Sequence, residues 1–161
     1  MNQNEYNTSV DQHADGMFRF ILKNIRDEDK ARDVVQDSFE KLWRNVENVN
    51  FLKVKSYLYT TAYHTMIDLI RREKRKEDFE KVDVREYAHS EHYSDLGEIL
   101  EEALERLSEV QRSVVLLRDY EGYSYLEIAK ITDLTESQVK VYIYRARVHL
   151  KNYIGSIESI V

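Results

Sequence analysis

One stretch of the chain reads Ser124-Tyr-Leu-Glu-Ile-Ala-Lys-Ile-Thr-Asp-Leu-Thr-Glu-Ser-Gln-Val-Lys-Val-Tyr-Ile-Tyr-Arg-Ala-Arg147. Ser124 and Glu127 have the spacing of a capping box, which satisfies backbone N–H groups left open at a helix start. Thr135 and Gln138 repeat this spacing, so the stretch contains two helix starts. Apolar residues recur at helical intervals after each start, and basic residues lie outside the second apolar stripe. The pattern predicts a helix-turn-helix whose second helix suits a DNA major groove.

The composition around this stretch favours an all-α protein. The 161-residue chain has no proline and only four glycines, so few residues force a helix to end. The lack of cysteine excludes disulfides, thiolate zinc sites and cysteine nucleophiles. No apolar run approaches the roughly 20 residues that span a bilayer, and the polar start lacks the order of a signal peptide. We therefore expect an intracellular protein without a cofactor or a metal site.

The net charge of −6 is unevenly distributed along the chain. Residues 1–76 carry 14 Lys and Arg against 12 Asp and Glu, whereas residues 77–112 carry 4 against 12. Residues 113–161 carry 6 of each sign, so the acidity lies in the middle. Neither end is strongly basic, and we expect weak DNA affinity when the protein is alone.

The N-terminal half predicts three amphipathic helices. The first is expected from about Gln12 to Ile25, after a polar and frayed start at residues 1–10. The second begins at the cap residue Asp27 and runs to about residue 46. The third begins between residues 51 and 54 and ends near Lys76, and among its tyrosines we expect Tyr57 to be the core member.

The helical periodicity is lost at residues 77–95, which are rich in acidic residues, histidine and serine. This composition predicts a flexible acidic linker. Helical spacing returns at Leu96, and Ser108 with Gln111 gives another capping-box spacing for a helix that ends before Gly122. We expect two small helical domains on one tether, the C-terminal one containing the helix-turn-helix.

Three motifs in this order resemble one known family. They are Asp33-Val-Val-Gln-Asp-Ser-Phe-Glu-Lys-Leu-Trp43, Ser56-Tyr-Leu-Tyr-Thr-Thr-Ala-Tyr-His-Thr-Met-Ile-Asp-Leu-Ile-Arg-Arg72, and Ser108-Glu-Val-Gln-Arg-Ser-Val-Val-Leu-Leu117 followed by the helix-turn-helix. Together they are similar to the extracytoplasmic-function (ECF) group of bacterial RNA polymerase sigma factors, in the sigma-70 family. The resemblance implies a cytoplasmic bacterial initiation factor with region 2 at residues 10–76, a linker at 77–95 and region 4 at 96–155. Its partners would be core RNA polymerase and promoter DNA, with no small-molecule substrate.

The resemblance assigns one set of residues to each partner. Residues on one face of the second helix would dock on core polymerase: Asp33, Gln36, Asp37, Glu40 and Trp43. The third helix would bind melted −10 promoter DNA, because aromatic faces stack on bases and cations follow phosphates: Lys53, Lys55, Tyr59, Tyr63, His64, Arg71 and Arg72. The helix-turn-helix would read −35 duplex DNA: Ser137, Gln138, Lys140, Val141, Tyr144 and Arg145.

Several positions depart from the family or have two uses. Gln138 suits reading of adenine and capping of its own helix equally well. The turn residue Asp133 stands where the family often has glycine, and Tyr142 stands where arginine is common. His64 replaces a usual asparagine. With Asp68 it has half the spacing of a metal site, but the sequence offers no third ligand nearby.

Two other classes of protein remain to be compared with this hypothesis. A helix-turn-helix regulator that binds operators without joining polymerase would account for residues 113–161, but it has no use for residues 15–76. An enzyme is disfavoured, because the chain has no glycine-rich phosphate loop and no paired carboxylates in an apolar setting. Factors of the ECF group are commonly held inactive by an anti-sigma partner, so the resemblance also implies a possible anti-sigma factor.

Overall fold

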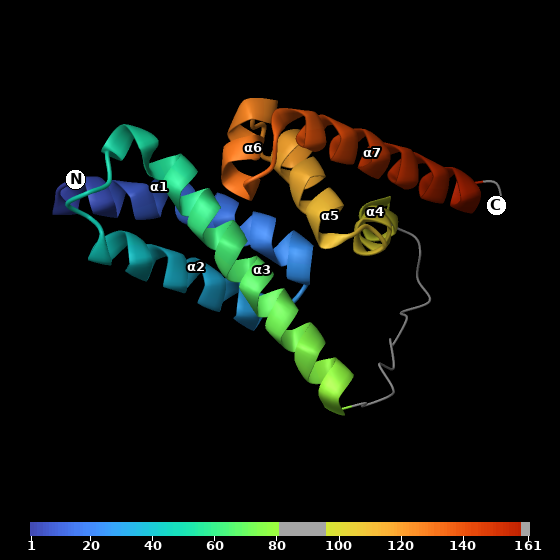
Figure 1. Ribbon diagram of the computed structural model, residues 1–161, viewed down its shortest axis with the longest axis horizontal. Coiled ribbons are helices and arrows are strands. Elements are labelled where there is room, and N and C mark those ends of the chain that lie inside the picture. Colours follow the sequence, from blue (N-terminus) through green and yellow to red (C-terminus); the bar gives the residue numbers. More distant parts are fainter. Residues whose placement is uncertain (81–95, 159–161) are drawn as a thin grey trace.

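The computed structural model describes residues 1–80 and 96–158, and all the regular elements in these ranges are helical (Figure 1). The elements are α1 (Gln3–Ile25), α2 (Glu28–Arg44), the short 3-10 helix η1 (Phe51–Lys53), α3 (Val54–Glu80), α4 (Leu96–Glu105), α5 (Glu109–Val115), the π-helical turn η2 (Leu116–Tyr120), α6 (Tyr125–Thr132) and α7 (Glu136–Glu158). The all-α prediction is confirmed. None of the described helices has the length and apolar character needed to cross a membrane.

Helices α1, α2 and α3 form an N-terminal unit, in which α3 crosses the other two (Figure 1). Asp27 caps α2 as predicted, because its carboxylate accepts a hydrogen bond from the Lys30 N–H at 3.1 Å. The core of the unit contains these fully buried apolar side chains from the three helices: Met17, Phe20, Ile21, Ala31, Leu42, Leu58, Ala62 and Met66. Burial of each large member contributes about 1.5–3 kcal/mol.

The chain start differs from the prediction, because residues 3–10 belong to α1. The Asn2 side chain accepts from the Glu5 N–H at 2.8 Å, and the Glu5 carboxylate accepts from the Asn2 N–H at 3.0 Å. This reciprocal capping box stabilises the first turn. Tyr6 then packs edge-on against Trp43 of α2, with 5.0 Å between ring centroids. The prediction of a frayed start is therefore wrong.

Helix α3 continues past the predicted end at Lys76 and reaches Glu80. Residues 77–80 contain neither proline nor glycine, so nothing in them opposes propagation of the helix. The helix therefore extends four residues into the segment that was predicted to be a linker. The remaining residues of that segment, 81–95, lie outside the described part of the chain.

Helices α4 to α7 form a C-terminal unit in which the long α7 packs across α5 and α4. Ser108 caps α5 as predicted, through its hydroxyl and the Gln111 N–H at 3.2 Å. The chain then widens into the π turn η2, where the Glu121 N–H donates to the Leu116 carbonyl at 3.1 Å. Gly122 follows with φ of +76°, a conformation that suits glycine, and turns the chain towards α6.

The two units are in direct contact. Helix α3 packs against α6, and α1 packs against α5 and α4 (Figure 1). Buried residues from both units form one continuous apolar cluster. The sequence predicted two domains joined by a flexible linker, and it did not predict that they are in contact.

Candidate functional site

Local hydrogen bonds define both helices of the helix-turn-helix. The Ser124 hydroxyl accepts from the Glu127 N–H, and the Glu127 carboxylate accepts from the Ser124 N–H, each at 3.1 Å. The Thr135 hydroxyl accepts from the Gln138 N–H at 3.1 Å, while the Gln138 side-chain oxygen accepts from the Thr135 N–H at 2.9 Å. Both predicted capping boxes are present. The amide oxygen of Gln138 is therefore engaged at the start of its own helix.

The turn between α6 and α7 depends on a left-handed residue. Asp133 has φ of 58° and ψ of 37°, and its N–H donates to the Ala129 carbonyl. Aspartate adopts this conformation more readily than most residues, although glycine does so at lower cost. The turn directs the apolar stripe of α7 into the core, where Val139, Ile143 and Ala146 are at most 1% exposed.

The opposite face of α7 is open to solvent. The residues predicted to read −35 DNA are all exposed there: Ser137, Gln138, Lys140, Val141, Tyr144 and Arg145. Tyr144 is 70% exposed, an unusual position for a large aromatic side chain without a partner surface. Lys140 lies 3.5 Å from Glu136 in a solvent-exposed pair that costs little to rearrange.

Arg147, two residues farther along α7, has a structural contact. Its guanidinium donates two hydrogen bonds to Asp119 of η2, at 2.6 and 3.2 Å. These hydrogen bonds raise the pKa of Arg147 above its ordinary value. The pair connects α7 to the π turn η2, which precedes α6, so Arg147 stabilises the helix-turn-helix.

A groove between α2 and α3 forms a second surface. Its lining contains four of the residues predicted to dock on a protein partner, together with side chains from α3: Asp33, Val34, Gln36, Asp37, Glu40, Thr65, Leu69 and Arg72. Arg72, expected on the DNA-binding face, thus lies beside the acidic residues. The three carboxylates make the groove predominantly acidic.

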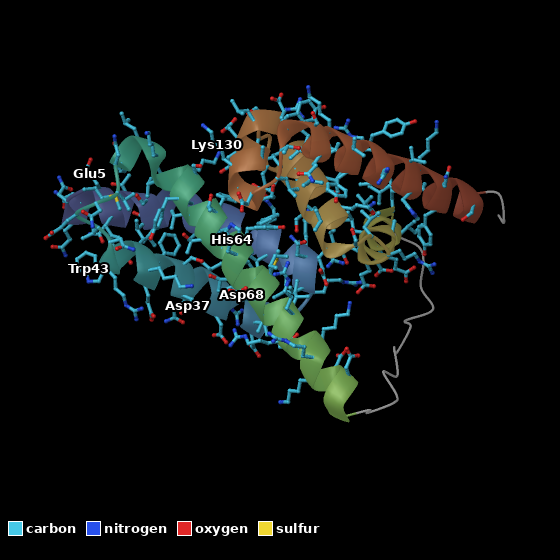
Figure 2. The ribbon with its side chains drawn as sticks, in the orientation of Figure 1. Glu5, Asp37, Trp43, His64, Asp68 and Lys130 are labelled. Carbon is cyan, nitrogen blue, oxygen red and sulfur yellow. The ribbon has the colours of Figure 1, made fainter. Side chains whose placement is uncertain are left out.

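Trp43 belongs to the same helix but does not line the groove. Its side chain is 50% exposed and contacts Tyr6 of α1. Figure 2 shows Asp37 and Trp43 on α2, on the side of the molecule away from α6 and α7. This side is open to a partner protein.

The third surface runs along α3 and divides into exposed and buried parts. The predicted cationic residues and the histidine are exposed: Lys53, Lys55, His64, Arg71 and Arg72. Tyr59 and Tyr63, in contrast, are only 2% and 5% exposed. Burial raises the pKa of both tyrosines. In this arrangement their rings are closed to any ligand.

Tyr57 is not the core tyrosine that the sequence predicted. It is partly exposed, and its hydroxyl accepts from the Asn45 amide at 3.2 Å and donates to the Lys41 carbonyl at 3.5 Å. It therefore links α3 to the end of α2. Tyr59 is buried instead, because its ring contacts Phe20 of α1 and Tyr123 of the C-terminal unit.

The described residues contain no group of three or more potential metal ligands, at His64 and Asp68 or elsewhere in these ranges. His89 and His92 lie outside the described residues.

Sequence patterns did not indicate the contact between the units. Glu121 accepts hydrogen bonds from Arg19 and Tyr59, which are 102 and 62 positions away. Asn24 contacts Ser113 across 89 positions. Periodicity and capping spacings report on neighbours in the chain, so they carry no signal for such pairs.

Comparisons with known proteins agree with the two-unit division. Residues 10–76 match the family described as Sigma-70 region 2, and residues 97–150 match Sigma-70, region 4. RNA polymerase sigma factor SigV of Bacillus subtilis (strain 168) is 32% identical over 142 residues, which cover 86% of this chain and 84% of that protein. The ECF RNA polymerase sigma-E factor of Haemophilus influenzae is 31% identical over 141 residues, covering 76% of this chain and 73% of that protein.

Two solved structures resemble most of the chain. The sigma factor RpoE of Bartonella quintana, solved in complex with the anti-sigma factor NepR, aligns with a TM-score of 0.77 at 25% identity. That alignment covers 93% of this chain and 96% of RpoE, so it includes both units. CnrH, solved with the cytosolic domain of CnrY, aligns with a TM-score of 0.72 at 23% identity, covering 96% of this chain and 90% of CnrH.

Proposed function

The chain belongs to the ECF group of the sigma-70 family of RNA polymerase sigma factors, and from this membership we propose how its three surfaces divide the work. A sigma factor binds core RNA polymerase and directs it to promoters, so the chain is an initiation factor and not an enzyme. The observation that carries the proposal is the combination of an acidic groove on α2 and α3 with an exposed recognition helix on one chain. We assign residues 10–76 to region 2, residues 96–155 to region 4 and the residues between them to a linker.

Core polymerase docks on α2. Three carboxylates, from Asp33, Asp37 and Glu40, face the groove, and the half-exposed Trp43 offers an apolar anchor one turn farther along. Interfaces of this kind combine an aromatic anchor with complementary charge, which guides association. The partner surface on polymerase is therefore basic with an apolar pocket.

The −35 element binds along the exposed face of α7. The N-terminal half of a recognition helix reaches base edges, and its flanks contact phosphates. Lys140, Val141, Tyr144 and Arg145 occupy these positions, with Ser137 and Gln138 at the helix start. Gln138 reads DNA only through the atoms that its capping bonds leave free.

The −10 element binds along α3 after its two DNA strands have separated. Lys53, Lys55, Arg71 and Arg72 follow the phosphates, and His64 lies on the same helix. Tyr59 and Tyr63 offer aromatic faces for unstacked bases, each stack contributing about 1–3 kcal/mol. Both tyrosines are buried in the described arrangement, and Tyr59 packs against Tyr123 of the C-terminal unit, so stacking on Tyr59 requires the two units to separate.

We also propose an anti-sigma partner and a cytoplasmic location. RpoE was solved with an anti-sigma factor, and its alignment spans both units of this chain. A partner that bridges both units would hold the promoter-binding surfaces of α3 and α7 in one inactive arrangement. The cytoplasm is where core polymerase and promoter DNA are present together.

Binding to core polymerase without DNA separates this function from that of an operator-binding regulator, which requires only the C-terminal unit. We expect the full chain to bind core polymerase in a fluorescence titration. Asp37→Lys should weaken this binding at least tenfold, about 1.4 kcal/mol, because it places a cation in the acidic groove.

Asp11→Lys is the matched control, because it introduces the same charge change at an exposed position of α1. This control should retain the affinity of the unsubstituted chain. If both variants bind core polymerase with equal affinity, the groove is not part of the interface. An absence of core binding by the full chain would favour the regulator instead.

A further inference from the structure

The contact between the two units is centred on a nearly buried carboxylate. The Glu121 side chain is only 6% exposed and accepts two hydrogen bonds from the Arg19 guanidinium, at 2.9 and 3.1 Å. It accepts a third hydrogen bond from the Tyr59 hydroxyl at 3.3 Å. A two-bonded arginine–carboxylate pair is directional and stronger than a neutral hydrogen bond. Glu121 therefore joins α1 and α3 to the turn before α6.

The backbone on both sides is shaped for this contact. The π turn η2 and the positive φ of Gly122 place Glu121 and Tyr123 at the start of α6. On α1, Gly16 leaves space for the Tyr59 hydroxyl, since a Cβ there would lie 2.6 Å from that oxygen. π-helical turns occur often at functional sites.

A second buried polar group lies on the same interface. Asn24 of α1 accepts from the Ser113 hydroxyl at 3.0 Å and from the Arg112 guanidinium at 3.3 Å. All three residues are at most 9% exposed. On the side of α3, the Tyr123 hydroxyl is buried and has no hydrogen-bond partner in the described part of the chain. An unsatisfied hydroxyl lowers the stability of the contact, so opening it is less costly.

In the described residues, the ion pairs and cation–π contacts across this interface have one polarity. Their cations come from the N-terminal unit: Arg19, Lys23, Arg26 and Lys55. Their carboxylate and aromatic partners come from the C-terminal unit: Glu101, Glu105, Tyr120, Glu121 and Tyr123. Arg26, for example, lies 2.7 Å from Glu105. Polar interfaces with complementary charge are typical of domains that dock and release.

Docking covers part of the aromatic side of the −10 surface, whereas its cationic residues stay exposed. Tyr59 contacts Tyr123 with 5.2 Å between ring centroids, and Lys55 lies over the same Tyr123 ring at 4.7 Å. The −35 face of α7 stays exposed. Promoter elements centred about 25 base pairs apart lie roughly 85 Å apart at 3.4 Å per pair, whereas a compact chain of this length has a radius of gyration of about 15 Å. The docked chain therefore cannot engage both elements at once.

We propose that the contact of Glu121 with Arg19 and Tyr59 is an autoinhibitory latch, which docks the C-terminal unit on the −10 face of α3 and must open before promoter recognition. This inference rests on the proposed function of α3. Its structural part, a reversible docking of the two units, can be measured without polymerase or DNA.

Spin labels at Gln12→Cys on α1 and Lys130→Cys on α6 report the distance between the units, because both positions are exposed and the chain has no other cysteine. The labelled chain with Arg19 and Glu121 unchanged should give one narrow peak in the distribution of distances between the two spin labels. Arg19→Glu and Glu121→Arg should each lower the ratio of docked to open molecules at least tenfold. The double variant, in which the charges are exchanged, should restore the narrow peak.

Asp119→Arg is the matched control, because the Asp119–Arg147 pair has similar geometry but lies within one unit. This variant should keep the narrow peak. A broad distribution in the unsubstituted chain, or a double variant that stays open, would overturn the latch. The restoration also excludes misfolding as the cause of opening in the single variants.

Transcription with limiting unlabelled chain tests the inhibitory role. Each single variant should at least double promoter-specific transcripts, and the double variant should return to the original level. Opening without any gain in transcripts would overturn autoinhibition. If the distances respond but even the unsubstituted chain starts no promoter-specific transcript, the docking stands and the proposed function fails.

Discussion

At the scale of single residues, side chains of the same type have different roles because their partners differ. Arg145 and Arg147 are two positions apart on α7, and both are exposed. Arg147 is held by Asp119, so its charge is already paired within the protein. Arg145 is the one we assign to promoter DNA.

Arg145→Ala should therefore lower promoter use far more than core binding. Loss of a base or phosphate contact costs about 1–3 kcal/mol, or roughly 5- to 150-fold in affinity for the −35 element. Transcript yield from a mapped promoter, measured beside affinity for core polymerase, checks this prediction.

Lys151→Ala provides the control, because it removes an exposed positive charge from the same helix outside the proposed site. We expect it to retain most of the promoter use. Parallel losses of promoter use and core affinity in Arg145→Ala would contradict the assigned role.

At the scale of the elements, the helix starts were predictable and the helix lengths were less so. A capping box involves residues three apart, so Ser124 with Glu127 and Thr135 with Gln138 could be identified directly. The end of α3 was placed too early because acidic residues were interpreted as a linker. An acidic composition indicates that a segment prefers solvent, but acidic residues do not end a helix in which proline and glycine are absent.

The first capping box of the helix-turn-helix should contribute measurably to stability. Ser124→Ala removes the hydroxyl that accepts from the Glu127 N–H, and such losses typically cost about 1 kcal/mol. Urea unfolding followed by circular dichroism measures the change in the free energy of unfolding.

Hydrogen bonds from Ser124 also hold the pKa of Glu127 below its ordinary value. The corresponding stabilisation is present above the ordinary glutamate pKa and is lost as the pH falls through the folded-state value. The difference between the unsubstituted chain and Ser124→Ala should thus shrink in acid. Thr8→Ala serves as the control, because that exposed hydroxyl only donates within α1 to the Asn4 carbonyl. A constant difference at all pH values would contradict the stabilisation of the Glu127 carboxylate by Ser124.

At the scale of the whole molecule, the arrangement of the units could not be inferred from local patterns. Tyr57 was expected in the core, yet Tyr59 and Tyr63 are the buried tyrosines of α3, and the second unit packs against Tyr59. The sequence indicated which residues belong to the candidate surfaces, but it did not indicate which of these surfaces are exposed and which are covered. The acidic groove and the recognition helix are exposed, whereas the aromatic part of the −10 surface is covered.

The central claim is that this one chain places core polymerase at specific promoters. Sequencing of transcript starts tests it most directly, with core polymerase, fragments of the source genome, and the chain present or absent. We predict starts that appear only with the chain and share upstream elements near −35 and −10. A set of starts identical to that of core polymerase alone would contradict the claim.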